Sequence, residues 1–242
     1  MIAPARDRGR LDGPLGHVLY CIGLTADFRQ RPYDTVRAHV SVLSEVLEHA
    51  DFTSLLYLSS TRVYSAASGT SETARLQASP LDPSDLYNLS KLMGESLCVN
   101  SGRDGTRIAR LSNVVGFDPH SDNFLSLLIR DALGGKIVLR SSPDASKDYI
   151  ALEDALAILP RIATEGVDGI YNVASGRNVR NGQVLEELKS LTGCVVEVPD
   201  QAPGSESSPI GIERLRREFS FSPSEPLAGL RAMVEAYRRS VG

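Results

Sequence analysis

Tyr87 and Lys91 stand four positions apart in the segment DLYNLSK, which covers residues 85–91. On a helix this spacing places both side chains on one face, close enough to interact. A nearby ammonium favours the phenolate form of a tyrosine and lowers its pKa, which makes the hydroxyl a usable acid or base. The spacing alone is weak evidence, because it also occurs on the exposed face of ordinary amphipathic helices.

A buried strand is predicted shortly before this pair, in SLLYLSS at residues 54–60. It ends on Ser59 and Ser60, and Thr61 follows. Ligands of α/β proteins bind outside the carboxyl ends of the strands. We therefore expect these three side chains to face a substrate hydroxyl or carbonyl.

Short apolar runs alternate with longer amphipathic runs along the chain, a pattern typical of strands joined by crossover helices. The predicted strands cover residues 17–23, 54–60, 106–112, 136–140, 169–174 and 194–198. The predicted helices cover residues 33–50, 85–99, 124–133, 152–164, 181–191, 212–218 and 227–239. The pattern predicts a doubly wound α/β core over 1–116, with core elements recurring to about 175, and a small substrate lobe over 117–242.

Four motifs follow one another in this chain: SSTRVY, YNLSK, RLSNVVG and KDY, with YNVASG after them. The set resembles the extended short-chain dehydrogenase/reductase family, which comprises the NAD(P)-dependent sugar-nucleotide epimerases and dehydratases. Members of that family carry SSxxVY, a Tyr-x-x-x-Lys helix, RxxNVxG and RDY in the same order. The resemblance covers residue 16 to the C-terminus and implies a Rossmann-like parallel sheet.

The resemblance also implies roles for individual residues. Tyr87 matches the catalytic acid/base, and Lys91 matches the lysine that lowers its pKa and binds the nicotinamide ribose. Ser60 matches the residue that hydrogen-bonds the reacting oxygen. The implied cofactor contacts are Gly23, Ser59, Lys91 and Arg6, and the implied substrate contacts are Thr61, Asn113 and Lys147. Two alternatives remain. Ser60 could merely end its strand, and the Asn113 amide could hydrogen-bond the backbone of a loop.

Two departures from the family pattern bear on the reaction and the substrate. The 4,6-dehydratases carry an Asp-Glu pair for water elimination where this chain has Thr61 and Arg62, which disfavours dehydration by that route. Lys147 replaces the arginine of RDY. A lysine pairs with phosphate as a point charge but lacks the bidentate fork, so a phosphorylated substrate and a different substrate class both stay open.

The family opens on a strand, a GxxGxxG turn and a helix that holds the pyrophosphate. Gly9, Gly13 and Gly16 precede the first clear strand, so the fold is expected to lack the first strand and the glycine-rich turn. Arg6 and Arg8 are interpreted as remnants of an NADP-binding edge, and tight binding of the dinucleotide by this chain alone is doubtful. A start internal to a longer reading frame is the alternative explanation.

The leading hypothesis is an NAD(P)-dependent epimerase or ketoreductase acting on a sugar nucleotide or related carbohydrate. A second hypothesis keeps Tyr87 and Lys91 as an acid/base pair for a cofactor-independent isomerisation, elimination or cyclisation. A third is a degenerate, non-catalytic binding partner, against which the retained Ser60, Tyr87 and Lys91 argue. The sequence does not decide between NAD and NADP.

The composition of the chain argues against several classes of partner. The 242 residues carry a formal net charge of −4, which disfavours nucleic acid as a partner. The three cysteines have neither CxxC nor zinc spacing, so we expect no metal site and no disulfide. No window is apolar enough for a membrane helix. We expect a cytoplasmic protein. The family resemblance implies a homodimer in which the helices of residues 36–47 and around Tyr87 pair with their mates, although their apolar stripes could equally pack on the sheet.

Overall fold

The computed structural model describes residues 13–24, 27–199 and 207–241. The chain forms two compact units and passes between them several times. Unit 1 comprises residues 1–59, 78–109 and 159–170. Unit 2 comprises residues 60–77, 110–158 and 171–242.

A four-stranded sheet in the order β1-β2-β3-β7 forms the framework of unit 1. Its strands are β1 (His17–Tyr20), β2 (Ser54–Ser60), β3 (Thr106–Leu111) and β7 (Gly169–Val173). β1 and β2 are parallel, with Leu19 opposite Leu56. The last residues of β2, β3 and β7 already belong to unit 2. Leu55, Leu56 and Tyr57 are fully buried, as expected for a parallel strand covered on both faces.

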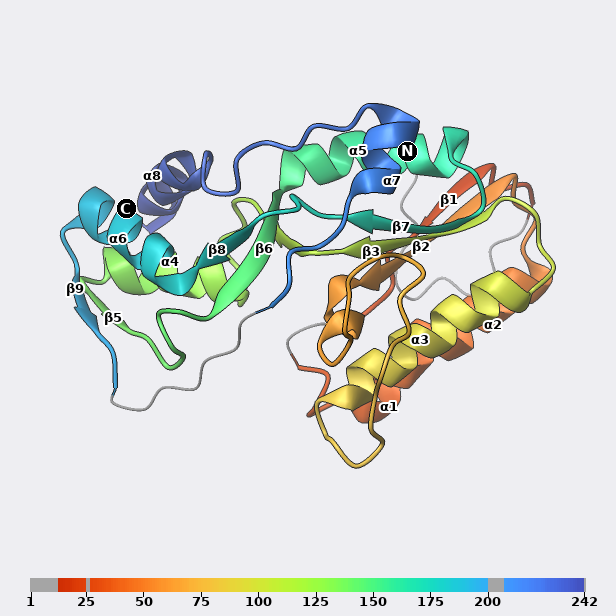
Figure 1. Cartoon of the computed structure of the whole chain (residues 1–242), viewed down its shortest axis with the longest axis horizontal. Helices are drawn as coiled ribbons and strands as arrows, with labels where there is room; N and C mark the ends of the chain where they lie inside the picture. Colours follow the sequence, from red (N-terminus) through yellow and green to blue (C-terminus); the bar gives the residue numbers. More distant parts are fainter. Residues whose placement is uncertain (1–12, 25–26, 200–206, 242) are drawn as a thin grey trace. The chain divides into compact units, whose positions relative to one another are not determined.

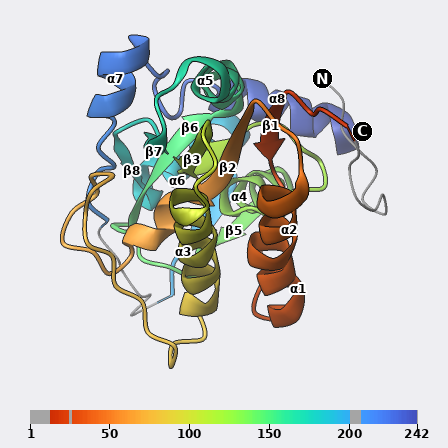
Figure 2. The ribbon, with the colours of Figure 1, turned by 90° about the vertical axis from the view of Figure 1, so that its right-hand side faces the viewer.

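The helices of unit 1 lie side by side, as both views show (Figure 1, Figure 2). They are α1 (Pro32–Val36), a π-helix (Arg37–Ser41), α2 (Val42–His49) and α3 (Asp85–Asn100). α1 begins on Pro32, whose fixed φ suits the first helical turn. Leu43 and Leu47 of α2 pack with Tyr57, Cys98 and other apolar side chains into one core cluster. This core holds α3, and with it the predicted Tyr–Lys pair, against the sheet.

Unit 2 contains two smaller sheets. One has the order β4-β6-β8, from β4 (Asn113–Val115), β6 (Ser146–Ala151) and β8 (Asn178–Arg180). The other pairs β5 (Lys136–Val138) with β9 (Val195–Glu197) in parallel. β4 and β6 are parallel and β6 and β8 antiparallel.

Three helices, α4 (Phe124–Leu133), α6 (Asn181–Thr192) and α8 (Leu230–Val241), contribute to one apolar core that includes Leu128, Ile129, Leu188 and Tyr237. Unit 2 also contains the 3-10 turn η2 (Thr61–Tyr64) and the helices α5 (Leu152–Glu165) and α7 (Glu213–Phe219). α5 runs on into unit 1 from Leu159. In the described part of the chain, no helix is long and apolar enough to span a membrane.

Most predicted elements are present, and the differences have local causes. β2 and α4 have the predicted limits, whereas the strand predicted at 17–23 ends at Tyr20. The helix predicted at 33–50 is interrupted by the π-helix, a change of hydrogen-bond step that apolar periodicity does not report. Three strands were not predicted, β4, β6 and β8, because they are short or begin on polar residues.

Candidate active site

The structure brings Tyr87 and Lys91 together on the inward face of α3. Tyr87 is 7% exposed and Lys91 is 5% exposed, so the pair does not lie on the solvent face of an amphipathic helix. The Lys91 ammonium nitrogen lies 5.9 Å from the centre of the Tyr87 ring. A buried lysine is rare unless the protein supplies partners for its charge, which sets this helix face apart from an ordinary packing surface.

The partners of Lys91 come from β2 and from the next turn of α3. Its Nζ donates a hydrogen bond to the Leu58 carbonyl oxygen at 2.8 Å. It also lies 5.1 Å from the centre of the Tyr57 ring. Burial lowers the pKa of Lys91 to about 8, although the charge of Glu95 opposes this shift. Lys91 therefore keeps its ammonium at pH 7 but loses its proton at lower pH than an exposed lysine does.

Glu95 is a buried carboxylate one turn beyond Lys91, only 4% exposed. The Ser59 hydroxyl donates to its Oε1 at 2.5 Å. Ser59 was predicted as a cofactor contact, and the structure commits its hydroxyl proton to Glu95. In any further hydrogen bond the Ser59 Oγ can therefore act only as an acceptor.

Gly23 lies in the loop after β1, against the same cluster. A Cβ at this position would lie 3.1 Å from His39 Nε2 and 3.5 Å from Lys91 Nζ. Because Gly23 has no side chain, its backbone can lie close to the Lys91 ammonium. The bond of that ammonium to Leu58 uses one of its three N–H donors. The predicted cofactor contacts Gly23 and Lys91 and the predicted acid/base Tyr87 therefore lie in one cluster.

The pyrophosphate end is a different case. Gly13 and Gly16 have positive φ values of 83° and 67°, but the Gly16 carbonyl accepts from the Thr53 and Ser54 amides, beside β1. These glycines precede β1, as their order in the sequence indicates, and flank Pro14, which forms an isolated parallel bridge with Asp51. In the ranges that the structure describes, no strand is followed by a glycine-rich turn and a helix. Gly9 and the predicted contact Arg6 lie outside those ranges, as does Arg8.

Ser60 and Thr61 begin unit 2. Ser60 occupies the N-cap of η2, where its Oγ accepts from the Arg62 amide at 3.2 Å. This bond uses the hydroxyl as acceptor and leaves its O–H to be donated elsewhere, which is the capacity that a hydrogen bond to a substrate oxygen requires. Thr61 is half-buried and Arg62 is exposed.

Lys147 and Asn113 lie on neighbouring strands of unit 2. Asn113 Nδ2 donates to the Asp148 carbonyl oxygen at 2.8 Å. This amide therefore holds β4 to β6, which favours the alternative that Asn113 satisfies a backbone group. The Lys147 ammonium lies 4.0 Å from the centre of the Phe124 ring. Burial lowers the pKa of Lys147, and the charge of Arg62 lowers it further. The charges of Lys147 and Arg62 therefore interact within unit 2.

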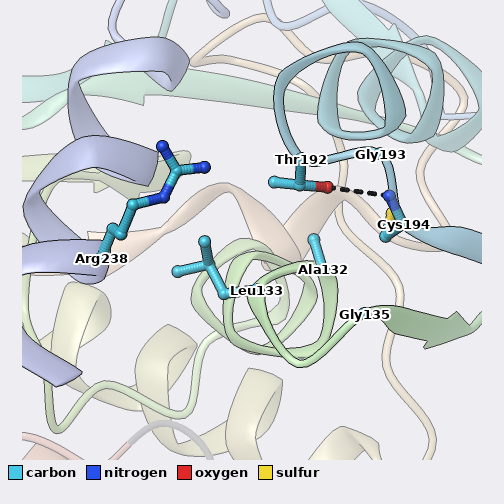
Figure 3. Close-up of a pocket in the computed structure, with 7 residues that line it drawn as sticks. All are labelled: Ala132, Leu133, Gly135, Thr192, Gly193, Cys194 and Arg238. Atoms are coloured by element: carbon cyan, nitrogen blue, oxygen red, sulfur yellow. Dashed lines mark hydrogen bonds between the residues drawn. The ribbon is translucent and has the colours of Figure 1, made fainter. Parts of the chain in front are cut away.

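A separate pocket of about 310 Å³ lies elsewhere in unit 2 (Figure 3). It sits at the C-terminal ends of α4 and α6, whose partial negative charge the guanidinium of Arg238 complements. Its lining residues are Ala132, Leu133, Gly135, Thr192, Gly193, Cys194 and Arg238. None of the predicted site residues is among them, so we assign it no part in the chemistry.

Sequence reasoning missed two members of the Lys91 cluster. Glu95 repeats the four-residue spacing of Tyr87 and Lys91, a signal that was available in the sequence. His39 is fully buried, and nothing in its helix marks it, because the π-helix that turns it inward leaves no trace in the apolar pattern.

A parallel sheet with crossover helices, and a buried tyrosine–lysine pair beside its strands, define this protein as a Rossmann-like α/β protein. The profile of the NAD dependent epimerase/dehydratase family matches residues 14–174. This is more than half of the chain, and the chain belongs to that family. The predicted fold class and the expectation of an enzyme of this family are confirmed.

Solved structures share the fold. MoeE5 in complex with UDP-glucose and NAD is 22% identical with a TM-score of 0.79, over 95% of this chain and 80% of that one. RMD from Pseudomonas aeruginosa, complexed with NADPH, is 22% identical with a TM-score of 0.75, over 93% and 82%. UDP-glucuronic acid 4-epimerase from Bacillus cereus, with UDP-glucuronic acid and NAD, is 19% identical with a TM-score of 0.72, over 90% and 71%. No curated protein sequence gives a significant match.

Proposed function

We propose that this protein is an NAD(P)-dependent epimerase or ketoreductase that acts on a sugar nucleotide, with Tyr87 as the acid/base. The observation that carries the proposal is the buried pair of Tyr87 and Lys91, with Gly23 close to the same ammonium. Family membership and the nucleotide-bound structures of the same fold support it.

The chain's own residues handle the proton. In the proposed reaction the Tyr87 phenolate takes the proton of a substrate hydroxyl, and the Lys91 ammonium stabilises that phenolate. The Ser60 hydroxyl donates to the same substrate oxygen. A bound nicotinamide would accept the hydride from the carbon, and an epimerase returns it to the opposite face. Burial excludes water from Tyr87, which strengthens its interaction with the ammonium.

The proposed substrate contacts are Thr61, Asn113 and Lys147 in unit 2. A diphosphate is the anion that the charges of Lys147 and Arg62 favour. Binding it offsets the repulsion that lowers the pKa of Lys147. UDP-glucose and UDP-glucuronic acid, which are bound to MoeE5 and to the Bacillus cereus epimerase, are the first compounds to assay.

The proposal is tested with the full chain, NAD(H) and NADP(H), and a panel of UDP- and GDP-linked hexoses, following nicotinamide absorbance and product chromatography. Tyr87→Phe should lower kcat roughly 10²–10⁴-fold, the range of general acid–base catalysis. Tyr33→Phe is the matched control, because it removes a hydroxyl from a tyrosine that is 86% exposed. Absence of hydride transfer with every pair of cofactor and substrate contradicts the proposal.

The same assay separates the cofactor-independent alternative. Turnover that persists after nicotinamide is removed, yet vanishes in Tyr87→Phe, assigns the pair to an isomerisation, elimination or cyclisation. Loss of turnover both without nicotinamide and in Tyr87→Phe assigns Tyr87 and Lys91 to redox chemistry.

We further propose a homodimer formed by α1, α2 and α3. Apolar side chains are exposed on α1 and α3: Val36 is 39%, Leu89 36%, Met93 53% and Val99 62% exposed. Burying such side chains against a second copy removes apolar surface from water. Sedimentation should show a dimer that Met93→Glu dissociates, and a monomeric wild type contradicts this assembly.

A further inference from the structure

The helix that precedes β2 contains a π-turn at residues 37–41. Two strand tyrosines bond to its carbonyl groups: Tyr20 donates to Ala38 O at 2.6 Å and Tyr57 donates to His39 O at 3.3 Å. On α3, a Cβ at Gly94 would clash with the Tyr57 hydroxyl and lie 2.8 Å from His39 O. The sheet and α3 thus fix the backbone at His39. Such single π-turns are frequent at functional sites.

The imidazole of His39 is fully buried and bonded through both nitrogens. The Leu24 amide lies 3.3 Å from Nε2, and Ser90 Oγ lies 2.8 Å from Nδ1. A backbone amide only donates, so Nε2 is the acceptor and the proton resides on Nδ1. Nδ1 therefore donates to Ser90, whose hydroxyl donates to the Tyr87 carbonyl oxygen at 2.9 Å.

The same imidazole contacts the side chain of Tyr87. The two ring centres are 5.3 Å apart at an angle of 89°, an edge-on arrangement that aromatic pairs favour. Phe28 also packs on Tyr87, with ring centres 5.3 Å apart. Tyr87 is held through its ring by His39 and Phe28 and through its backbone by Ser90.

The charge state of His39 agrees with this pattern. Burial lowers the pKa of His39 to about 3, and the charge of Lys91 contributes to the shift. A protonated ring would lose the acceptor that the Leu24 amide uses and would carry a second positive charge beside Lys91. His39 is therefore a neutral link at physiological pH and is not itself a base for the reaction.

We propose that His39 is a positioning residue that holds Tyr87 through Ser90, with the loop after β1 fixing the imidazole. The inference rests on the proposed function, in which Tyr87 carries the proton. Gly23 and Leu24 of that loop lie against His39 Nε2, so the loop and the tyrosine are set by one imidazole.

Substitutions of similar shape test the proposal because each keeps only one of the two His39 bonds, that to Ser90 or that to Leu24. His39→Asn places an amide donor near the position of Nδ1 and keeps the bond to Ser90. His39→Gln reaches the position of Nε2 and keeps only the Leu24 bond, and Ser90→Ala removes the step to Tyr87. His17→Gln is the matched control, since His17 Nδ1 also bonds a serine, Ser54, at 2.8 Å but is exposed and outside the Tyr87 cluster.

His39→Gln and Ser90→Ala should each lower kcat about tenfold with KM nearly unchanged, the effect of one neutral hydrogen bond. His39→Asn should stay within about threefold of wild type, as should His17→Gln. Equal losses in His39→Asn and His39→Gln indicate a packing role alone and overturn the link.

A second readout does not depend on turnover. Nitrogen NMR of the histidine rings should show His39 protonated on Nδ1 only and unchanged between pH 8 and pH 5. Tyrosine carbon NMR should show a Tyr87 titration that moves in His39→Gln and Ser90→Ala but not in His39→Asn. A proton on Nε2, or a Tyr87 signal equal in all variants, overturns the link. If wild type transfers no hydride, the proposed function fails while the spectra still decide the link.

Discussion

Two lysines, the buried Lys91 of unit 1 and the half-buried Lys147 of unit 2, both have pKa values lowered by burial, yet the neighbouring charge is negative for Lys91 and positive for Lys147. Lys91 has the carboxylate of Glu95 on the next turn of its helix, and that charge raises its pKa again. Lys147 has the guanidinium of Arg62, which lowers its pKa further. The carboxylate beside Lys147, that of Asp148, accepts bonds from Ser175 and from the Arg177 amide.

The difference separates two roles for a buried cation. A lysine whose charge is compensated within the protein can stay ionised without a ligand, as a fixed partner for a phenolate. A lysine that faces another cation gains most when an anion binds. The surroundings therefore support the two proposed roles, a fixed cation beside Tyr87 for Lys91 and substrate binding for Lys147.

The largest expected effect is on kcat. Lys91→Met should lower kcat by on the order of 10²-fold or more, because the Tyr87 phenolate loses its cation. Lys147→Met should leave kcat within a few-fold of wild type. Steady-state kinetics on both variants check this, and a kcat loss of similar size in the two would erase the distinction.

The next effect is on KM. Lys147→Met should raise KM for a sugar nucleotide roughly 10–100-fold, as expected for the loss of one or two charge-assisted bonds at about 1.5–3 kcal/mol each. Lys147→Arg offers a bidentate fork and should keep or lower KM. Added salt should weaken substrate binding less in Lys147→Met than in wild type. A KM unchanged in Lys147→Met contradicts the binding role.

The neutral state of His39 gives a pH test of the unfolding free energy. The pKa of His39 falls from about 6.5 in an unfolded chain to about 3 in the folded protein, so the unfolded chain binds more protons between these values. Stability should therefore decrease as pH falls through this window, by about 2 kcal/mol at pH 5.

Urea unfolding at pH 7 and pH 5 measures this contribution as the difference between wild type and His39→Asn. Because the Lys91 charge contributes to the low pKa, Lys91→Met should reduce the pH dependence and Lys147→Met should not. An identical pH dependence in wild type and His39→Asn shows that His39 is not held neutral.

The smallest effect is a shift of the pH profile. Glu95→Gln removes the charge that raises the pKa of Lys91, so Lys91 should lose its proton at lower pH. The alkaline limb of kcat should move to lower pH, with a loss of roughly 3–10-fold at pH 8. Glu165→Gln is a matched control, because Glu165 is an exposed helix carboxylate. A profile equal to wild type would show that Glu95 is only structural.

The sequence predicted the fold class and the Tyr–Lys pair because their signals are local. The apolar run of β2 and the four-residue spacing on α3 are read directly from neighbouring residues. His39 and the Ser59–Glu95 bond depend on where separate elements meet, and a π-turn shifts the register by one residue without changing the composition. The short strand β6 begins on polar residues, so its pattern resembles a loop.

Binding of the nicotinamide cofactor tests the central claim most directly. The full chain is titrated calorimetrically with NAD(H) and NADP(H), alongside Lys91→Met and Lys147→Met. The account predicts that wild type and Lys147→Met bind at least one cofactor with equal affinity and that Lys91→Met binds it at least about tenfold more weakly. Absence of binding to wild type, or equal weakening in the two variants, would contradict it.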